Sequence, residues 1–254
     1  MKSRKLMMFL LVVIMLLVAA CGPGEKKSTK SGEEGVDASK FAIETTNNAP
    51  AVKDAVLKVA LVKDSPLVGI FYTNIGQGDG YDGELISTFF NNQLFDTDEN
   101  FEITDTGLST LSVDIPNKKA TIKIKDGVKW SDGQPLVADD IIYTFEVIAN
   151  KDYTGVRFDD ESLKVIGVKE YHEGKAGNIS GLKKIDDKTV EVSFTEIGQG
   201  IYTIGNGLIG SVLPKHYLKD IPIKDLEKSE RVRSKVLTLG AYTIVSNVQG
   251  ESLN

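Results

Sequence analysis

Apolar and polar residues alternate over two pairs of neighbouring segments, and each pair predicts a β-hairpin. The first pair covers residues 108–115 and 120–125, with a Pro-Asn-Lys break at 116–118. The second covers residues 181–194 and turns at an Asp-Asp-Lys sequence at 186–188. A period of two, interrupted by turn-forming residues, is the pattern of strands that bury one face.

Other segments have the spacing of helices or of buried strands. Three segments place apolar residues three or four positions apart and predict helices: 84–95, 139–150 and 223–235, the last charged and exposed. Segments 56–62 and 241–248 predict strands, the first of them buried. A turn at 250–252 then points to a partner strand beyond the last residue. Helices mixed with hairpins predict a mixed α/β (α+β) fold and not a doubly wound parallel sheet.

The first 51 residues predict export and anchoring. Three basic residues among the first five precede an uncharged apolar run at 6–18, which is shorter than the roughly 20 residues that span a bilayer. This pattern predicts a signal peptide over 1–20. The sequence Leu-Val-Ala-Ala-Cys that ends at Cys21 resembles a bacterial lipobox, so we expect Cys21 to be lipidated. Residues 21–51 consist mainly of Gly, Ser, Lys, Glu and Thr with few large apolar residues, and predict a flexible tether.

Composition excludes several classes of partner. The chain has a net charge of −6 and an isoelectric point of about 5.1. Proteins that bind nucleic acid need a basic surface, so we expect no nucleic-acid partner. We likewise expect contact with the membrane through the lipid anchor only. Cys21 is the single cysteine, so no internal disulfide can form.

A long motif gives the chain a family resemblance. Residues 121–146 read TIKIKDGVKWSDGQPLVADDIIYTFE. This segment resembles the signature of solute-binding protein family 5, the oligopeptide- and dipeptide-binding proteins of ABC importers. Segments 167–194, 213–217 and 240–242 look like further landmarks of that family, in the usual order. The resemblance covers the chain from about residue 56 to its end, and is closest to the oligopeptide-binding lipoproteins of Gram-positive bacteria.

Two residues of the motif carry structural expectations. Trp130 is large enough to organise a small core, and its indole N–H needs a hydrogen-bond acceptor when it is buried. The helix that follows has Val137 where the family usually has Ser or Thr as the N-cap. Valine offers no side-chain oxygen, and a missing N-cap costs about 0.5–2 kcal/mol.

The resemblance implies a periplasmic-binding-protein-like fold of class II, a clamp of two lobes that closes on its ligand. Residues 52–83 and 166–254 are then the base of the first lobe, and 84–165 an inserted subdomain. The second lobe is then absent, including a carboxylate expected to meet the peptide N-terminus. We therefore expect residues 1–254 to be an N-terminal fragment without measurable peptide affinity of its own.

Ligand contacts are expected from two loops, 65–74 and 202–207, which combine aromatic residues with accessible backbone. The candidate residues are Phe71, Tyr72, Asn206 and Gly207. The alternative is that these are ordinary core aromatics and turn residues.

No catalytic, metal or cofactor site is predicted. Residues 205–210 match GxGxxG, but Pro214 prevents the helix that a dinucleotide site requires. Residues 96–107 begin like a calcium loop and lack its Gly at the sixth and its Glu at the twelfth position. His172 and His216 have no second metal ligand at a suitable spacing. We expect a binding protein and not an enzyme.

The favoured hypothesis is an oligopeptide-binding lipoprotein on the outer face of the cytoplasmic membrane of a Gram-positive bacterium, which passes peptides to the transmembrane subunits of an ABC permease. The alternatives are a truncated surface module for signalling or adhesion, and a surface hydrolase. The residues leave open whether the ligand is a peptide, a pheromone, a sugar or nickel.

Overall fold

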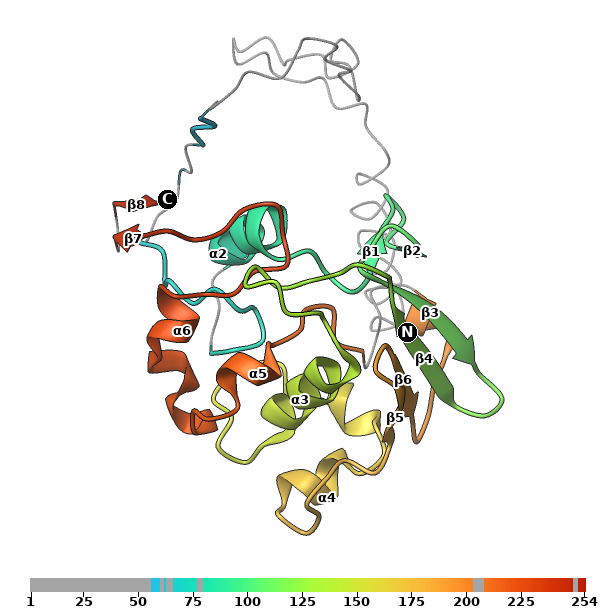
Figure 1. The fold of residues 1–254 in the computed structure, drawn as a ribbon. Coiled ribbons are helices and arrows are strands. Elements are labelled where there is room, and N and C mark those ends of the chain that lie inside the picture. The colour runs from blue at the N-terminus through green and yellow to red at the C-terminus, as the bar shows by residue number, and fades with distance from the viewer. Residues whose placement is uncertain (1–55, 60–61, 63–65, 77–79, 203–207, 249–250) are drawn as a thin grey trace, which may run out of the picture. The chain divides into compact units, whose positions relative to one another are not determined.

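The computed structural model describes residues 56–59, 62, 66–76, 80–202, 208–248 and 251–254 (Figure 1). The chain divides into two compact units, Met1–Val59 and Ala60–Asn254. All the helices and strands that the structure describes belong to the second unit. The predicted signal peptide, Cys21 and the tether lie outside the described residues.

A four-stranded antiparallel sheet is formed by the two predicted hairpins, which are both confirmed. Its strands are β3 (Ser109–Asp114), β4 (Lys119–Ile124), β5 (Leu182–Asp186) and β6 (Thr189–Ser193). They lie in the order β3-β4-β6-β5. One face is buried, because the alternating residues of the two central strands point into the core: Ala120, Ile122, Ile124, Val190 and Val192.

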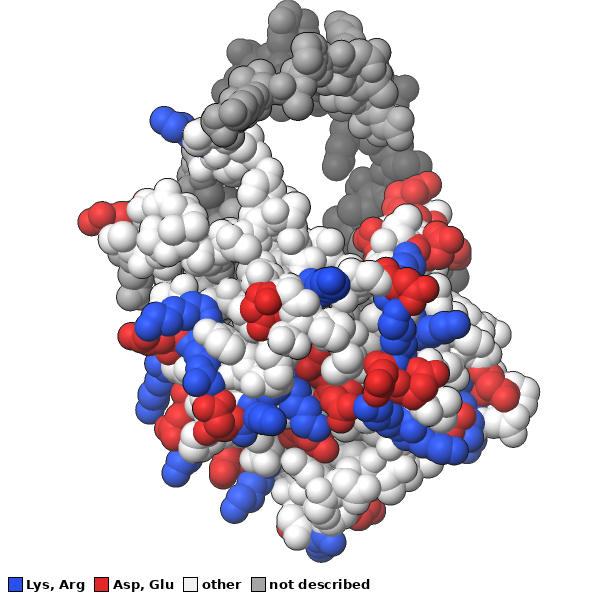
Figure 2. All heavy atoms as spheres, in the orientation of Figure 1, with Lys and Arg blue, Asp and Glu red and all other residues white. Residues whose placement is uncertain are grey.

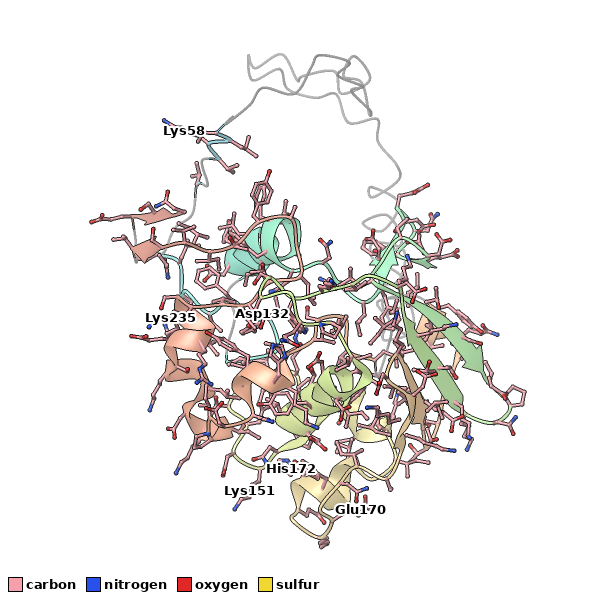
Figure 3. All side chains as sticks on the ribbon, in the orientation of Figure 1. Lys58, Asp132, Lys151, Glu170, His172 and Lys235 are labelled. Atoms are coloured by element: carbon pink, nitrogen blue, oxygen red, sulfur yellow. The ribbon has the colours of Figure 1, made fainter. Side chains whose placement is uncertain are left out.

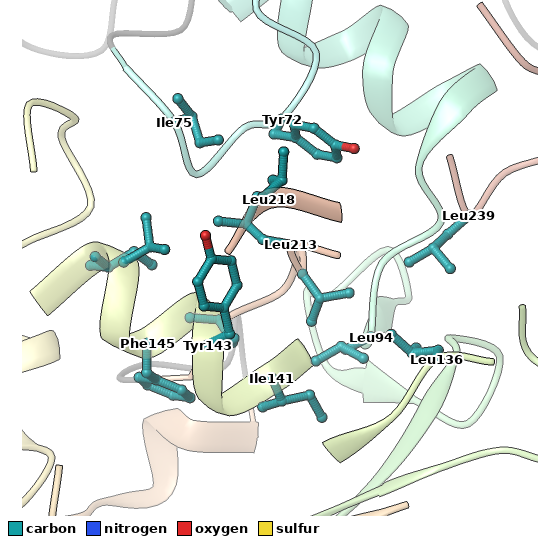
Figure 4. Close-up of a cluster of buried hydrophobic side chains, with 14 of the residues drawn as sticks. Tyr72, Ile75, Leu94, Leu136, Ile141, Tyr143, Phe145, Leu213, Leu218 and Leu239 are labelled. Atoms are coloured by element: carbon teal, nitrogen blue, oxygen red, sulfur yellow. The ribbon is translucent and has the colours of Figure 1, made fainter. Parts of the chain in front are cut away.

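Helix α3 (Ala138–Ala149) confirms the predicted helix over 139–150 and packs on this sheet. It contributes Ile141, Phe145 and Ile148 to the core, three residues at helical spacing. Figure 4 shows Ile141 and Phe145. Val137 is the N-cap, and no side-chain oxygen caps the helix from that position. The acid half of a capping box is nevertheless formed, since the Val137 N–H donates to Asp140 Oδ2 at 3.1 Å.

The predicted helix over 84–95 is displaced toward the N-terminus. The structure has α2 (Gly80–Leu85) followed by a π-helical turn (Ile86–Phe90), and the backbone becomes extended at Asn91. The next residues pair with distant backbone, because Leu94 N–H donates to the Gly210 carbonyl at 2.7 Å and Gln93 accepts from Leu108 at 3.0 Å. Tertiary pairing therefore ends the helix before its apolar pattern ends.

The predicted helix over 223–235 is broken in two. A 3₁₀ helix (Ile223–Lys228) is followed by α6 (Glu230–Arg233), and Ser229 between them accepts a hydrogen bond from the Arg231 N–H at 3.2 Å. Leu226 and Val232 are buried, so the segment is not simply a charged, exposed helix. A serine that caps the second helix interrupts the first.

Both predicted terminal strands are wrong as stated. Residues 56–59 and 62 have no regular structure, and Val56 and Val62 are exposed. At the other end only β7 (Asn247–Val248) is a strand, and it pairs with β8 (Ser252–Leu253), so the partner strand does lie within the chain. Before β7, the Gly240 and Tyr242 N–H groups donate to carbonyls at the end of the π-helical turn, which keeps 240–242 out of a sheet.

The remaining described elements are short. They are β1 (Asp96–Thr97), β2 (Ile103–Thr104), a 3₁₀ turn (Ser162–Lys164), α4 (Val168–His172), a 3₁₀ turn (Gln199–Tyr202) and α5 (Lys215–Leu218). No helix in the described ranges combines the length and the apolar character that crossing a membrane requires.

Asp140 connects the family motif to the segment at 213–217. Its Oδ2 accepts a hydrogen bond from the buried indole N–H of Trp130 at 3.1 Å, the partner that this side chain was expected to need. Its Oδ1 accepts from the Lys215 N–H at 2.8 Å. Burial raises the pKa of Asp140, while its N–H donors act in the opposite direction. With the Val137 N–H described above, this carboxylate accepts three N–H donors, from Trp130, Val137 and Lys215.

The predicted division into a lobe base and an inserted subdomain stays a prediction. Strands β3 and β4 come from the range 84–165, and β5 and β6 come from 166–254. Because β4 pairs with β6, the two ranges share one sheet.

Candidate ligand-binding cleft

A cleft of about 620 Å³ opens between four segments of the second unit. It is lined by the loop at 70–74, by α2 with the π-helical turn, and by residues 156–162 and 208–211. A cavity of this size falls in the range of small-molecule and peptide sites, roughly 300–1,000 Å³. It is therefore the candidate functional site of the described residues.

Hydrogen bonds connect the first of the two loops from which ligand contacts were predicted to Tyr153 and Ser211. Thr73 Oγ1 donates to Ser211 Oγ at 2.9 Å, and Asn74 Nδ2 donates to the Ser211 carbonyl at 2.6 Å. Tyr153 OH donates to the Asn74 carbonyl at 2.8 Å. The first loop and the segment that follows the second loop are therefore neighbours, and both line the cleft.

Phe71 and Tyr72 themselves are core residues, with 3% and 2% of their surface exposed. Figure 4 shows Tyr72 in the cluster of buried side chains. Tyr72 OH donates to the Leu237 carbonyl at 3.0 Å and accepts from the Leu237 N–H at 3.1 Å. Burial raises the pKa of Tyr72 well above its usual range. Their neighbours Thr73 and Asn74 line the cleft instead.

Asn206 and Gly207 lie outside the described residues. The next residues along the chain, Leu208–Ser211, do line the cleft. A ligand role for Phe71, Tyr72, Asn206 and Gly207 stays a prediction.

A second pocket of about 460 Å³ adjoins the first. The two share four lining residues: Ser87, Gln93, Leu208 and Gly210. Its outer wall is the β1–β2 hairpin, where Phe101 is 64% exposed and has a φ of 62°. The recess therefore extends beyond the first cleft toward an exposed aromatic side chain.

Sequence reasoning missed one wall of the cleft, residues 156–162. The sequence could have indicated this wall, because a polar loop with Arg157 next to an aromatic residue directly follows the helix of the motif. Loops that follow a rigid element often carry binding residues.

The two histidines take part in packing and local hydrogen bonds. His172, labelled in Figure 3, stacks on Phe158 with ring centroids 4.2 Å apart, and its Nδ1 lies 3.1 Å from the Ala149 carbonyl. His216 Nε2 lies 2.9 Å from Asp132 Oδ2. In the described ranges, no three potential metal ligands gather in one place. The face shown in Figure 2 carries basic and acidic residues interspersed.

Comparison with known proteins identifies a family to which this chain is similar. The family model of the bacterial extracellular solute-binding proteins, family 5 Middle, matches residues 107–254. The oligopeptide-binding protein OppA of Lactococcus lactis subsp. cremoris (strain SK11) is 34% identical over 257 aligned residues, 96% of this chain and 41% of that protein. AppA of Bacillus subtilis (strain 168), also an oligopeptide-binding protein, is 35% identical over 51% of this chain and 21% of its own length.

Solved structures agree with the fold prediction. Lactococcal OppA, solved in its closed conformation with an endogenous peptide, superposes with a TM-score of 0.70 at 32% identity, over 75% of this chain and 36% of that one. Bacillus subtilis AppA in complex with a nonapeptide gives 0.57 at 26% identity, over 72% and 33%. The predicted mixed α/β, periplasmic-binding-protein-like fold is confirmed.

The chain spans about two fifths of the length of the lactococcal relative, 41%. The family model nevertheless covers more than half of the chain, and it includes the Trp130 motif, α3 and all four strands of the central sheet. The protein belongs to family 5 of the bacterial extracellular solute-binding proteins.

Proposed function

We propose that this protein binds oligopeptides outside the cell and delivers them to the transmembrane subunits of an ABC importer. The observation that carries the proposal is the 34% identity to an oligopeptide-binding protein, which extends over 96% of this chain. The cleft supports it, because polar side chains such as Thr73, Ser87 and Arg157 line it and can contact a peptide. Delivery breaks no bond, since binding energy is used to close two lobes about a hinge.

We expect the full-length protein encoded by the gene to retain peptides. The measurement is to incubate it with a pool of random nonapeptides, to remove unbound material and to identify what is retained by mass spectrometry. Calorimetry with a retained peptide then gives its Kd. The parallel arms use a sugar mixture and Ni²⁺, the other ligand classes that the sequence leaves open. Retention of sugar or nickel without any peptide would contradict the proposal.

The proposed cellular location is the outer face of the cytoplasmic membrane of a Gram-positive bacterium, with lipid on Cys21. Each buried CH₂ of an acyl chain contributes roughly 0.8 kcal/mol, and stable anchoring takes more than one chain. The residues between Cys21 and the folded unit then act as a tether. This arrangement keeps the cleft close to the permease.

Replacing Cys21 by serine is expected to release the protein into the medium without changing its peptide affinity. Serine cannot form the thioether that carries the lipid, and the cleft lies in the other compact unit. The measurement is the distribution of protein between the membrane fraction and the medium. Replacement of Ser28 by alanine, in the predicted tether, is the control. Full retention of the Cys21→Ser protein on the membrane would rule out anchoring through Cys21.

A further inference from the structure

Arg157 is the only lysine or arginine among the described residues that line the two adjoining pockets. Its backbone N–H lies 3.4 Å from Tyr153 OH. Its guanidinium group makes no hydrogen bond or ion pair with any residue in the described ranges. The cleft therefore contains a guanidinium group that has no direct ion-pair partner among the described residues.

The acidic side chains of the same wall are already engaged. Asp159 Oδ1 accepts from the Ser162 N–H at 2.9 Å. Glu161 Oε1 lies 2.7 Å from Lys164 Nζ. Both carboxylates therefore have partners within the chain, and neither draws Arg157 away from a ligand.

The two acids of α2 that line the cleft also have acceptor roles within the chain. Asp82 is buried, and its Oδ2 accepts from the Gly69 N–H at 3.0 Å. Glu84 Oε1 lies 3.5 Å from Thr88 Oγ1, a weak contact on an exposed side chain. Because acidic residues outnumber the single arginine in the lining, the cleft disfavours a ligand that carries only negative charge. A zwitterion, such as a peptide with a free amine and a carboxylate, suits it better.

The loop that carries Arg157 is braced on both sides. Before it, Tyr153 OH donates to the Asn74 carbonyl at 2.8 Å, and Thr154 Oγ1 lies 3.2 Å from Glu227 Oε2. After it, Asp159 and Ser162 exchange hydrogen bonds in both directions. A cation on a braced loop loses less conformational freedom when a ligand binds, which favours affinity.

We propose that Arg157 binds a carboxylate group of the solute in this cleft, an inference that rests on the proposed peptide-binding function. The planar guanidinium can donate two parallel N–H bonds to the two oxygens of one carboxylate. In a peptide, that group is either the C-terminal carboxylate or the side chain of Asp or Glu. The chemistry is the same, and the two sources can be separated by the choice of peptide.

The test uses calorimetry on the full-length protein with three forms of one nonapeptide built from alanine and leucine. The first form has a free C-terminus, the second a C-terminal amide, and the third has the amide and one internal glutamate. Arg157→Gln is expected to weaken binding of the free acid by about 10- to 100-fold, the usual range for a hydrogen bond to a charged group. The same substitution leaves the Kd of the amide unchanged.

Two further variants complete the design. Lys183→Gln, which removes an exposed cation on β5 outside the cleft, is expected to leave all three Kd values unchanged. Arg157→Lys keeps the charge without the planar fork, and is expected to recover part of the affinity for the free acid. If the glutamate-containing amide binds as tightly as the free acid and responds equally to Arg157→Gln, a side-chain carboxylate can also fill the site.

The inference is overturned if the unmodified protein binds the free acid and the amide equally well and Arg157→Gln changes neither. That result leaves the proposed function intact, because peptides still bind. If none of the nonapeptide forms and no peptide of the random pool is bound, the proposed function itself fails and this inference fails with it. Comparing acid with amide on the unmodified protein also tests the idea without any variant having to fold.

Discussion

Replacing Trp130 by alanine is expected to lower the free energy of unfolding by about 3–5 kcal/mol, the usual cost of truncating a large buried aromatic side chain. Trp130 is 2% exposed, so its removal leaves a cavity in a closely packed region. It also leaves Asp140 without one of its three N–H donors. The measurement is chemical denaturation of the purified protein, followed by circular dichroism.

Trp130→Phe separates the two contributions. Phenylalanine keeps most of the apolar volume and lacks the indole N–H, so we expect a loss intermediate between the unmodified protein and Trp130→Ala. Tyr202→Ala is the control, because that aromatic side chain is 41% exposed. A loss below about 1 kcal/mol for Trp130→Ala, within the range of ordinary surface changes, would show that this residue does not organise the core.

Replacing Asp140 by alanine is expected to lower the free energy of unfolding by about 2–4 kcal/mol. Three N–H groups lose their acceptor, those of Trp130, Val137 and Lys215. A buried donor without a partner costs about 1–3 kcal/mol, and water can reach the two part-buried backbone groups, so the sum is smaller than three full penalties. The same denaturation experiment measures it.

Asp139→Ala provides the matched control one residue earlier on α3. The Asp139 carboxylate pairs with Lys184 and Lys215, and its side chain is 38% exposed. Exposed ion pairs contribute about 0–1 kcal/mol. If the two substitutions lower the free energy of unfolding equally, the buried hydrogen bonds of Asp140 contribute no more to stability than the exposed ion pairs of Asp139.

Trp130 and Asp140 are in direct contact, so their effects should not add. The double variant is expected to lose less than the sum of the two single losses, because the indole N–H and its acceptor are then both removed. Strict additivity would show that their hydrogen bond contributes little.

The parts of the fold that the sequence predicted well are those in which local pattern and packing agree. The hairpins at 109–124 and 182–193 and the helix α3 follow their apolar periods closely. In each case the residues that the period assigns to one face are also the residues that the core buries. Propensity and tertiary structure then give the same answer.

The errors lie where distant backbone decides the outcome. Leu94 was expected in a helix, but its N–H bonds to the Gly210 carbonyl. Tyr242 was expected in a strand, but its N–H bonds to the Phe89 carbonyl. Neither partner can be found from a period along the chain, since each is more than a hundred residues away. The local sequence pattern predicts secondary structure poorly where such long-range contacts determine it.

The candidate site was predicted in part. The loop at 70–74 was expected near the ligand and does line the cleft. The residues chosen from it were its aromatic residues, Phe71 and Tyr72, which are buried in the core. Thr73 and Asn74 carry no motif that separates them from other polar loop residues. Arg157 was missed because an isolated arginine in a loop has no sequence signature, and only the three-dimensional structure shows that it faces a cleft without a partner.

The pairing of β4 with β6 has a consequence for how this protein can change. A segment can be exchanged between related proteins only if its two ends lie close together and its interior makes few backbone hydrogen bonds to the rest of the chain. Residues 84–165 do not meet that condition, because β4 contributes one side of a ladder whose other side, β6, comes after the segment ends. A chimera that replaces this range alone has to reproduce the register of Ile122 opposite Val190, or two central strands lose their neighbours.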